Sequence, residues 1–163
     1  MAGGDIEIHE LEELFDRSES FYKTDGVVEG DAIEKVAIEC LDWASIHQVR
    51  RDNYRYLMNL LSGIREVTPI FPALQDENMP FGLPVYFSGV SRDVVNTILG
   101  NASIGLTIHW EEMHKPPFTP VQDEAVAMSD GILTLNVDQY TSRAQLDYLA
   151  EQLHTAVKQA KKH

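Results

Sequence analysis

Two histidines, His109 and His114, lie five residues apart in the sequence, with Trp110, Glu111 and Glu112 between them. Imidazole and carboxylate groups at short spacing can bind zinc, and paired carboxylates can transfer protons. The spacing matches no common zinc site, however, and adjacent side chains on a loop rarely converge on one point. We therefore predict that these residues line a cleft and bind no metal.

The segment that must position these histidines is SRDVVNTILGNASIGLTIHW, residues 91–110. Ser91 is a favourable cap for a helix whose apolar residues recur at helical spacing, and Gly100 marks the end of that helix. A strand is expected over 104–110. A short helix followed by a strand would direct His109 towards a cleft.

Three arginines are further candidates for binding. Arg92 could reach an anionic ligand, although an Arg92–Asp93 pair in the first turn of a helix also has an ordinary explanation, because the helix dipole favours a carboxylate there. Arg50 and Arg51 precede two tyrosines. A net charge of -13 argues against nucleic-acid binding, which needs clustered cationic groups. We therefore expect an intrachain ion pair or a dimer contact at these two arginines.

The composition is that of a globular chain of 163 residues with one cysteine, Cys40. No apolar run is long enough for a transmembrane helix, and the N-terminus has no signal-peptide pattern. A single cysteine excludes an intrachain disulfide and fits a reducing cytoplasm. Because Cys40 lies on the apolar face of a predicted helix, we expect a buried, unreactive thiol.

The spacing of apolar residues predicts a first helix over about 7–20, a break with Gly26 and Gly30, and then one long helix over 31–63. Asp31 and Glu34 form a capping-box pattern at its start. A continuous helix of this length would span roughly 45 Å at about 1.5 Å per residue, as in a helix that connects two domains or packs on a partner.

The remaining pattern predicts an α+β fold, in which a small mixed or antiparallel sheet is covered by helices mainly on one face. The chain would then comprise a helix and linker over 1–30 and an α+β domain over 31–163. Besides the elements already named, the strands are expected over 67–71, 83–88 and 132–135, and the helices over 121–129 and 142–158.

Four pieces of sequence, in order, resemble the C-terminal small domain of pyridoxal-phosphate-dependent aminotransferases of the aspartate aminotransferase superfamily, and most of all the DegT/StrS sugar aminotransferases. The likeness covers roughly residues 46–158. The pieces are RRDNYRYLMNLLSGI, LPVYFS with SRDVVNTILGNASIGLTIHW, AVAMSDGILTLNVDQY, and TSRAQLDYLAEQLHTAV.

This resemblance implies that His109 and Trp110 lie at the mouth of a substrate cleft, with His114 on the loop that follows. In that family these positions contact the substrate, while a lysine of a separate large domain forms the bond to the cofactor. Lys23 and Lys35 do not lie in the setting of that lysine. Asn136 also replaces a proline that the family usually has.

The resemblance therefore predicts part of an aminotransferase, acting on a nucleotide-linked sugar in sugar biosynthesis. Without the lysine-bearing large domain, the chain would be inactive alone and would bind no pyridoxal phosphate by itself. Its expected partners are a second copy, in a homodimer packed through the first and the long helix, or the missing large domain. The alternative is a non-catalytic binding or oligomerisation module derived from the small domain.

Overall fold

A computed structural model describes residues 13–14, 16–17, 20, 30–109 and 123–162. The chain forms two compact units, an amino-terminal unit (Met1–Leu41) and a sheet unit (Asp42–His163). The first predicted helix, over about 7–20, lies mostly outside the described residues.

Helix α2 (Ala32–Glu39) of the amino-terminal unit begins with the predicted capping box. The Asp31 carboxylate accepts hydrogen bonds from two backbone amides of the first turn, and the Glu34 carboxylate accepts one from the Asp31 amide at 3.0 Å. The helix contains no buried residue. Cys40 follows it as the C-cap and is exposed. The expectation of a buried thiol was therefore wrong, because the helix that carries Cys40 has no buried face.

The single long helix predicted over 31–63 is wrong, because the chain leaves helical geometry at residues 40–42. A second helix, α3 (Trp43–Leu61), begins after Asp42, whose backbone is not helical. The Asp42 carboxylate accepts a hydrogen bond from the Ser45 amide at 3.0 Å and so caps α3. An aspartate that prefers to cap a new helix is the local cause of the break.

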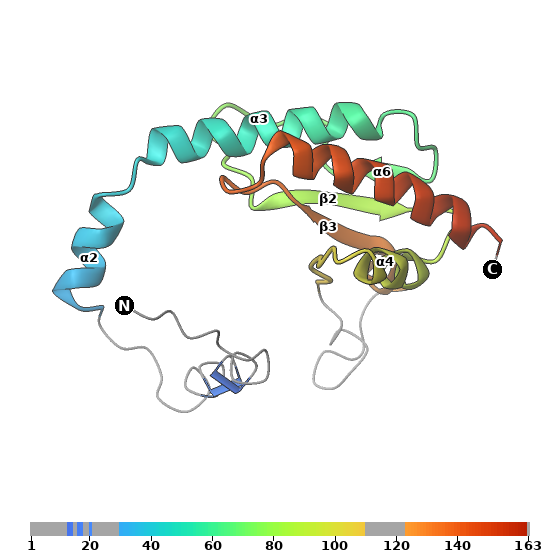
Figure 1. Ribbon diagram of the computed structural model, residues 1–163, viewed down its shortest axis with the longest axis horizontal. Helices are drawn as coiled ribbons and strands as arrows, with labels where there is room; N and C mark the ends of the chain where they lie inside the picture. The colour runs from blue at the N-terminus through green and yellow to red at the C-terminus, as the bar shows by residue number, and fades with distance from the viewer. Residues whose placement is uncertain (1–12, 15, 18–19, 21–29, 110–122, 163) are drawn as a thin grey trace. The chain divides into compact units, whose positions relative to one another are not determined.

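The sheet unit has an α+β fold built on one antiparallel sheet with the strand order β1-β2-β3. Figure 1 shows α3 and α6 running beside the sheet. In the described ranges, no helix combines the length and apolar character needed to cross a membrane. The elements after α3 are β1 (Val67–Pro69), β2 (Gly82–Phe87), α4 (Arg92–Asn101), α5 (Asp123–Gly131), β3 (Ile132–Asn136) and α6 (Arg143–Ala160).

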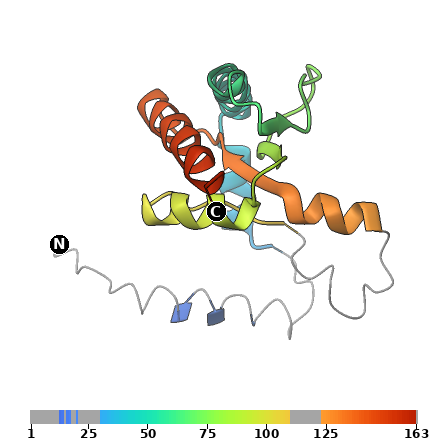
Figure 2. The same cartoon turned by 90° about the vertical axis from the view of Figure 1, so that its right-hand side faces the viewer.

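One face of the sheet carries the hydrophobic core. Figure 2 shows α3, α4 and α6 on one side of the sheet, and α6 packs against both of the other helices. Side chains alternate between the two faces of a strand, so every second residue of β2 and β3 points into this layer. The core residues contributed by these two strands are Leu83, Val85, Phe87, Leu133 and Leu135, and all are buried.

The strand predicted over 104–110 is wrong for its described part, 104–109. There the chain forms one isolated bridge, Thr107 with Thr134, in which the Thr134 amide donates to the Thr107 carbonyl oxygen at 3.1 Å. The Gly105 carbonyl oxygen instead accepts from the Asn136 side chain at 3.2 Å. Residues 104–109 therefore contact β3 through one backbone bridge and one side-chain bond, and they form no ladder with it.

Candidate functional site

A pocket of about 540 Å³ lies on the face of the sheet opposite the core. Its floor is made of the residues of β2 and β3 that alternate with the core residues. We call it the sheet pocket, and its walls come from α3, the segment after β1, residue 109 and α5. The lining residues are Tyr54, Ile70, Phe71, Ala73, Leu74, Asn78, Met79, Pro80, Phe81, Gly82, Pro84, His109, Met128, Ile132 and Thr134.

Pro84 explains why the chain leaves the sheet at the edge of this pocket. In the register of the β1–β2 ladder, Ile70 is the next residue opposite Pro84, and the Ile70 amide donates to the Pro84 carbonyl oxygen at 3.0 Å. Proline has no amide hydrogen to return a bond to Ile70. The ladder therefore ends at Pro69, and residues 71–81, which we call the clamped loop, depart from it.

Arg51 of α3 fixes the middle of the clamped loop. Its Nη1 donates to the carbonyl oxygens of Gln75 and Asn78, the second at 2.8 Å. Its Nη2 lies 3.3 Å from Asp76 Oδ1. The Arg51 side chain is buried, whereas that of Asp76 is exposed, so the two backbone oxygens are the main partners. The predicted intrachain ion pair is thus confirmed for Arg51, whereas Arg50 bonds to neutral partners; a dimer contact at these arginines stays a prediction.

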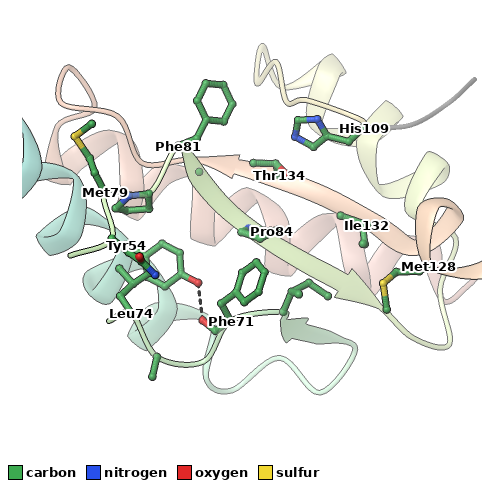
Figure 3. A pocket seen from close by; sticks show the side chains of 15 residues that line it. Tyr54, Phe71, Leu74, Met79, Phe81, Pro84, His109, Met128, Ile132 and Thr134 are labelled. Atoms are coloured by element: carbon green, nitrogen blue, oxygen red, sulfur yellow. Dashed lines mark hydrogen bonds between the residues drawn. The ribbon is translucent and has the colours of Figure 1, made fainter. Parts of the chain in front are cut away.

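Two more residues of α3 hold the ends of the loop. Arg50 donates through Nη1 to the Pro80 carbonyl oxygen at 3.3 Å and through Nε to Gln139 Oε1 at 2.8 Å. The Tyr54 hydroxyl donates to the Phe71 carbonyl oxygen, as the dashed line in Figure 3 shows. Burial raises the pKa of Tyr54, which keeps the hydroxyl protonated as this bond requires. The loop is therefore held at four carbonyl oxygens by one helix.

His109 is the predicted site residue that lines the sheet pocket. Figure 3 shows Phe81, Thr134 and His109 along one side of β2, with Tyr54 and Phe71 along the other. Trp110 and His114 lie outside the described residues, so the grouping of these two with His109 stays a prediction.

Arg92 does not line the pocket but supports its floor. The guanidinium is buried, and its Nη1 donates to the carbonyl oxygen of Ile132, the first residue of β3, at 3.2 Å. Its Nε lies 2.6 Å from Asp93 Oδ1 and forms an ion pair with it. The geometry of this contact is not that of a hydrogen bond, so Nε has no hydrogen-bond partner. A contact between Arg92 and an anionic ligand stays a prediction, and the contacts observed link α4 to β3.

Pattern reasoning missed the apolar residues of the clamped loop. It predicts residue 71 as the end of a strand over 67–71, whereas β1 ends at Pro69, and it assigns no site residue between that strand and the next. Phe71, Met79 and Phe81 are largely exposed although they are large and apolar. Large apolar side chains in an irregular segment between two strands were the available signal, since such segments are usually polar.

The described residues provide no lysine at the sheet pocket that could form a bond to pyridoxal phosphate. The lysines among them are Lys35 on α2 and three at the end of α6 and just after it, and none lines the pocket. Lys35 is exposed and lies 4.0 Å from Glu39, and Lys161 lies 2.6 Å from Glu66. The described residues also contain no group of three side chains suited to hold a metal ion.

No protein-family model matches the sequence, and no curated protein matches it. Several solved structures, in contrast, are similar to this chain. Spr1654 from Streptococcus pneumoniae, described as a sugar aminotransferase, is similar in its PMP form with a TM-score of 0.65 and 18% identity, over 72% of this chain and 32% of that chain. The chain has the fold of one part of a sugar aminotransferase. The same protein is also matched in a PLP form, with a TM-score of 0.61.

Two further solved structures share this fold. Helicobacter pylori PseC, an aminotransferase involved in the biosynthesis of pseudoaminic acid, has a TM-score of 0.68 at 12% identity, over 90% of this chain and 47% of that chain. DesI, solved in the presence of its TDP-sugar product, has a TM-score of 0.63 at 12% identity, over 74% of this chain and 33% of that chain. The chain thus spans about a third of the length of the first solved structures it matches.

Proposed function

We propose that this chain supplies the C-terminal small domain of a DegT/StrS-like aminotransferase that acts on a nucleotide-linked sugar. The main support is the shared fold, which covers 72% of this chain but only 32% of Spr1654. No described lysine lines the pocket, and in the family that the sequence resembles the lysine that binds the cofactor lies on the large domain, so we propose that a large domain supplies it here. Alone, the described part of the chain would not transfer an amino group.

In this proposal the chain's own residues bind and orient the substrate. His109 is held at the pocket by the segment that runs beside β3, and we propose that it contacts the substrate together with Trp110 and His114. Arg92 would act on this site through Ile132, because it bonds to the first carbonyl oxygen of β3. Pyridoxal phosphate, bound by the large domain, would supply the amino-transfer chemistry.

Reconstitution tests this proposal. The purified chain is incubated with pyridoxal phosphate, an amino donor and a nucleotide-linked keto-sugar, first alone and then with a lysine-bearing domain encoded beside it or in the same reading frame. Amino transfer is expected only with that domain. A stoichiometric imine between pyridoxal phosphate and a lysine of this chain alone, trapped by reduction, would overturn the proposal.

A binding or oligomerisation module is the second candidate, and one observation favours it. The sheet pocket is formed by described residues of this chain without a second domain. The same reconstitution separates the two candidates, because a lysine-bearing domain that restores amino transfer excludes a purely non-catalytic role.

We also propose that the chain forms a dimer. Ile33 and Val36 are exposed on α2 of the amino-terminal unit, and Trp43 is exposed at the start of α3 in the sheet unit. Exposed apolar side chains can promote association. Sedimentation across a range of concentrations tests this. A monomer at every concentration would contradict it.

A further inference from the structure

The sheet pocket is shaped by contacts within the chain. Four carbonyl oxygens of the clamped loop accept hydrogen bonds from side chains of α3. The donors are Arg50, Arg51 and Tyr54. A wall fixed in this way does not need to be ordered when a ligand enters, and binding sites that are already formed bind more tightly for that reason. The volume of about 540 Å³ lies within the ordinary range for small-molecule sites.

The chemistry of the lining restricts what can bind. None of the fifteen described lining residues is a lysine, arginine, aspartate or glutamate, although the chain carries 13 basic and 26 acidic residues. The rings of Tyr54, Phe71 and Phe81 are spread over two sides of the pocket (Figure 3). Met79 and Met128 add flexible, polarisable side chains.

A few polar groups stand among these apolar ones. Asn78 lines the pocket from the clamped loop, where its backbone oxygen is bonded to Arg51. Thr134 contributes a hydroxyl from the floor, and His109 an imidazole from the opposite wall. Donors and acceptors at isolated points of an apolar site fix the orientation of a ring by its edge.

We propose that the sheet pocket binds an uncharged, flat ring, the base of the nucleotide-linked sugar. This inference rests on the proposed function, because a nucleotide-linked sugar has three chemically distinct parts. A diphosphate needs cationic groups, which the described lining lacks, and a sugar needs many hydrogen-bonding groups. The base has flat faces that stack on aromatic rings and an edge that can bond to Asn78 or Thr134.

Titration of the full chain with thymidine and with uridine, up to their solubility limits, tests this site. Nuclear magnetic resonance would follow the methyl groups of Met79 and Met128 and the amide of Gly82. Saturable shifts at these three positions are expected with either nucleoside. Pyrophosphate and glucose at the same concentrations should leave them unchanged.

Two substitutions connect such shifts to the pocket chemistry. Phe71→Ala removes one stacking surface from an exposed position, and is expected to weaken thymidine binding by about fivefold or more. Thr134→Val keeps the shape but removes the hydroxyl, and should weaken binding by about three- to tenfold. Tyr140→Ala is the matched control, because Tyr140 is exposed and outside the pocket; its affinity should equal that of the wild type.

Two results would overturn the proposal: no nucleoside-dependent shift at the pocket, or shifts that Phe71→Ala and Thr134→Val both leave unchanged. Failure here is distinguishable from failure of the proposed function. If nucleosides do not bind but a lysine-bearing domain restores amino transfer, the aminotransferase assignment stands and the base site is wrong. If nucleosides bind at the pocket and no such domain restores transfer, the base site stands and the aminotransferase assignment fails.

Discussion

Replacing Arg51 with methionine should destabilise the sheet unit, because the clamped loop loses its central anchor. Two hydrogen bonds to backbone oxygens are lost, at Gln75 and Asn78, together with an ion pair to the exposed Asp76. A hydrogen bond from a charged donor contributes about 1.5–3 kcal/mol, and an exposed ion pair about 0–1 kcal/mol. Removing a buried guanidinium offsets part of this loss, so we expect the free energy of unfolding to fall by about 2–4 kcal/mol.

Urea unfolding followed by circular dichroism measures this change, and hydrogen exchange of the amides of residues 73–79 locates it. Arg55→Met is the matched control. Arg55 lies on the same helix, is half exposed, and lies 3.7 Å from Asp52, so its removal should cost less than about 0.5 kcal/mol. Asp76→Asn should cost under about 1 kcal/mol, because the Asp76 carboxylate is 99% exposed.

The reasoning is refuted if Arg51→Met is as stable as the wild type, or if Arg55→Met costs equally much. It is also refuted if exchange in the loop is unchanged while stability falls, because the bonds to Gln75 and Asn78 would then not be what holds the loop.

Three other predictions concern the sheet unit. Leu133→Ala should cost about 2–5 kcal/mol in urea unfolding, since Leu133 is fully buried in the core; a cost below that of an ordinary surface substitution would contradict the assignment of this face. Gly82→Ala should cost about 1–3 kcal/mol, because its new methyl group would lie 2.3 Å from Thr134 Cγ2 and 3.0 Å from a backbone oxygen; unchanged stability and unchanged amide shifts would contradict the close approach. The Lys161 ammonium beside Glu66 lowers the pKa of the Glu66 carboxyl. The stability that this ion pair contributes is therefore present above the unfolded-state pKa of Glu66, and it is lost as the pH falls through the lower folded-state pKa. Glu66→Gln should remove this part of the acid dependence in unfolding measured at several pH values, and an identical pH profile would show that the pair contributes nothing.

Local signals in the sequence predicted where α2 and α4 begin, but they missed the break between α2 and α3. Ser91 caps α4 by accepting a hydrogen bond from the Val94 amide at 3.4 Å, and Asp31 forms the predicted capping box with Glu34 at the start of α2. The α+β class was also accessible, because the apolar spacing of β2, β3 and α6 agrees with their burial. These features depend on residues a few positions apart.

Features that depend on distant residues could not be predicted in this way. The bonds from Arg51 join residues 24 and 27 positions apart, and that from Arg50 spans 30. Nothing in the local pattern of residues 75–82 indicates that an arginine pair on an earlier helix holds this loop. In the same way, the bond from the Asn136 side chain to the Gly105 carbonyl oxygen joins residues 31 positions apart, which local spacing does not indicate.

The hydrogen bonds that hold the clamped loop have a consequence for which substitutions this chain can accept during evolution. Apart from the one ion pair with Asp76, α3 bonds to the loop through backbone oxygens, which every residue type possesses. The side chains at 74, 79 and 81 can therefore be exchanged without removing these bonds, and with them the surface that the pocket presents. A framework of this kind separates the residues that set specificity from those that set stability, so related chains could acquire different ligands through substitutions in one short loop.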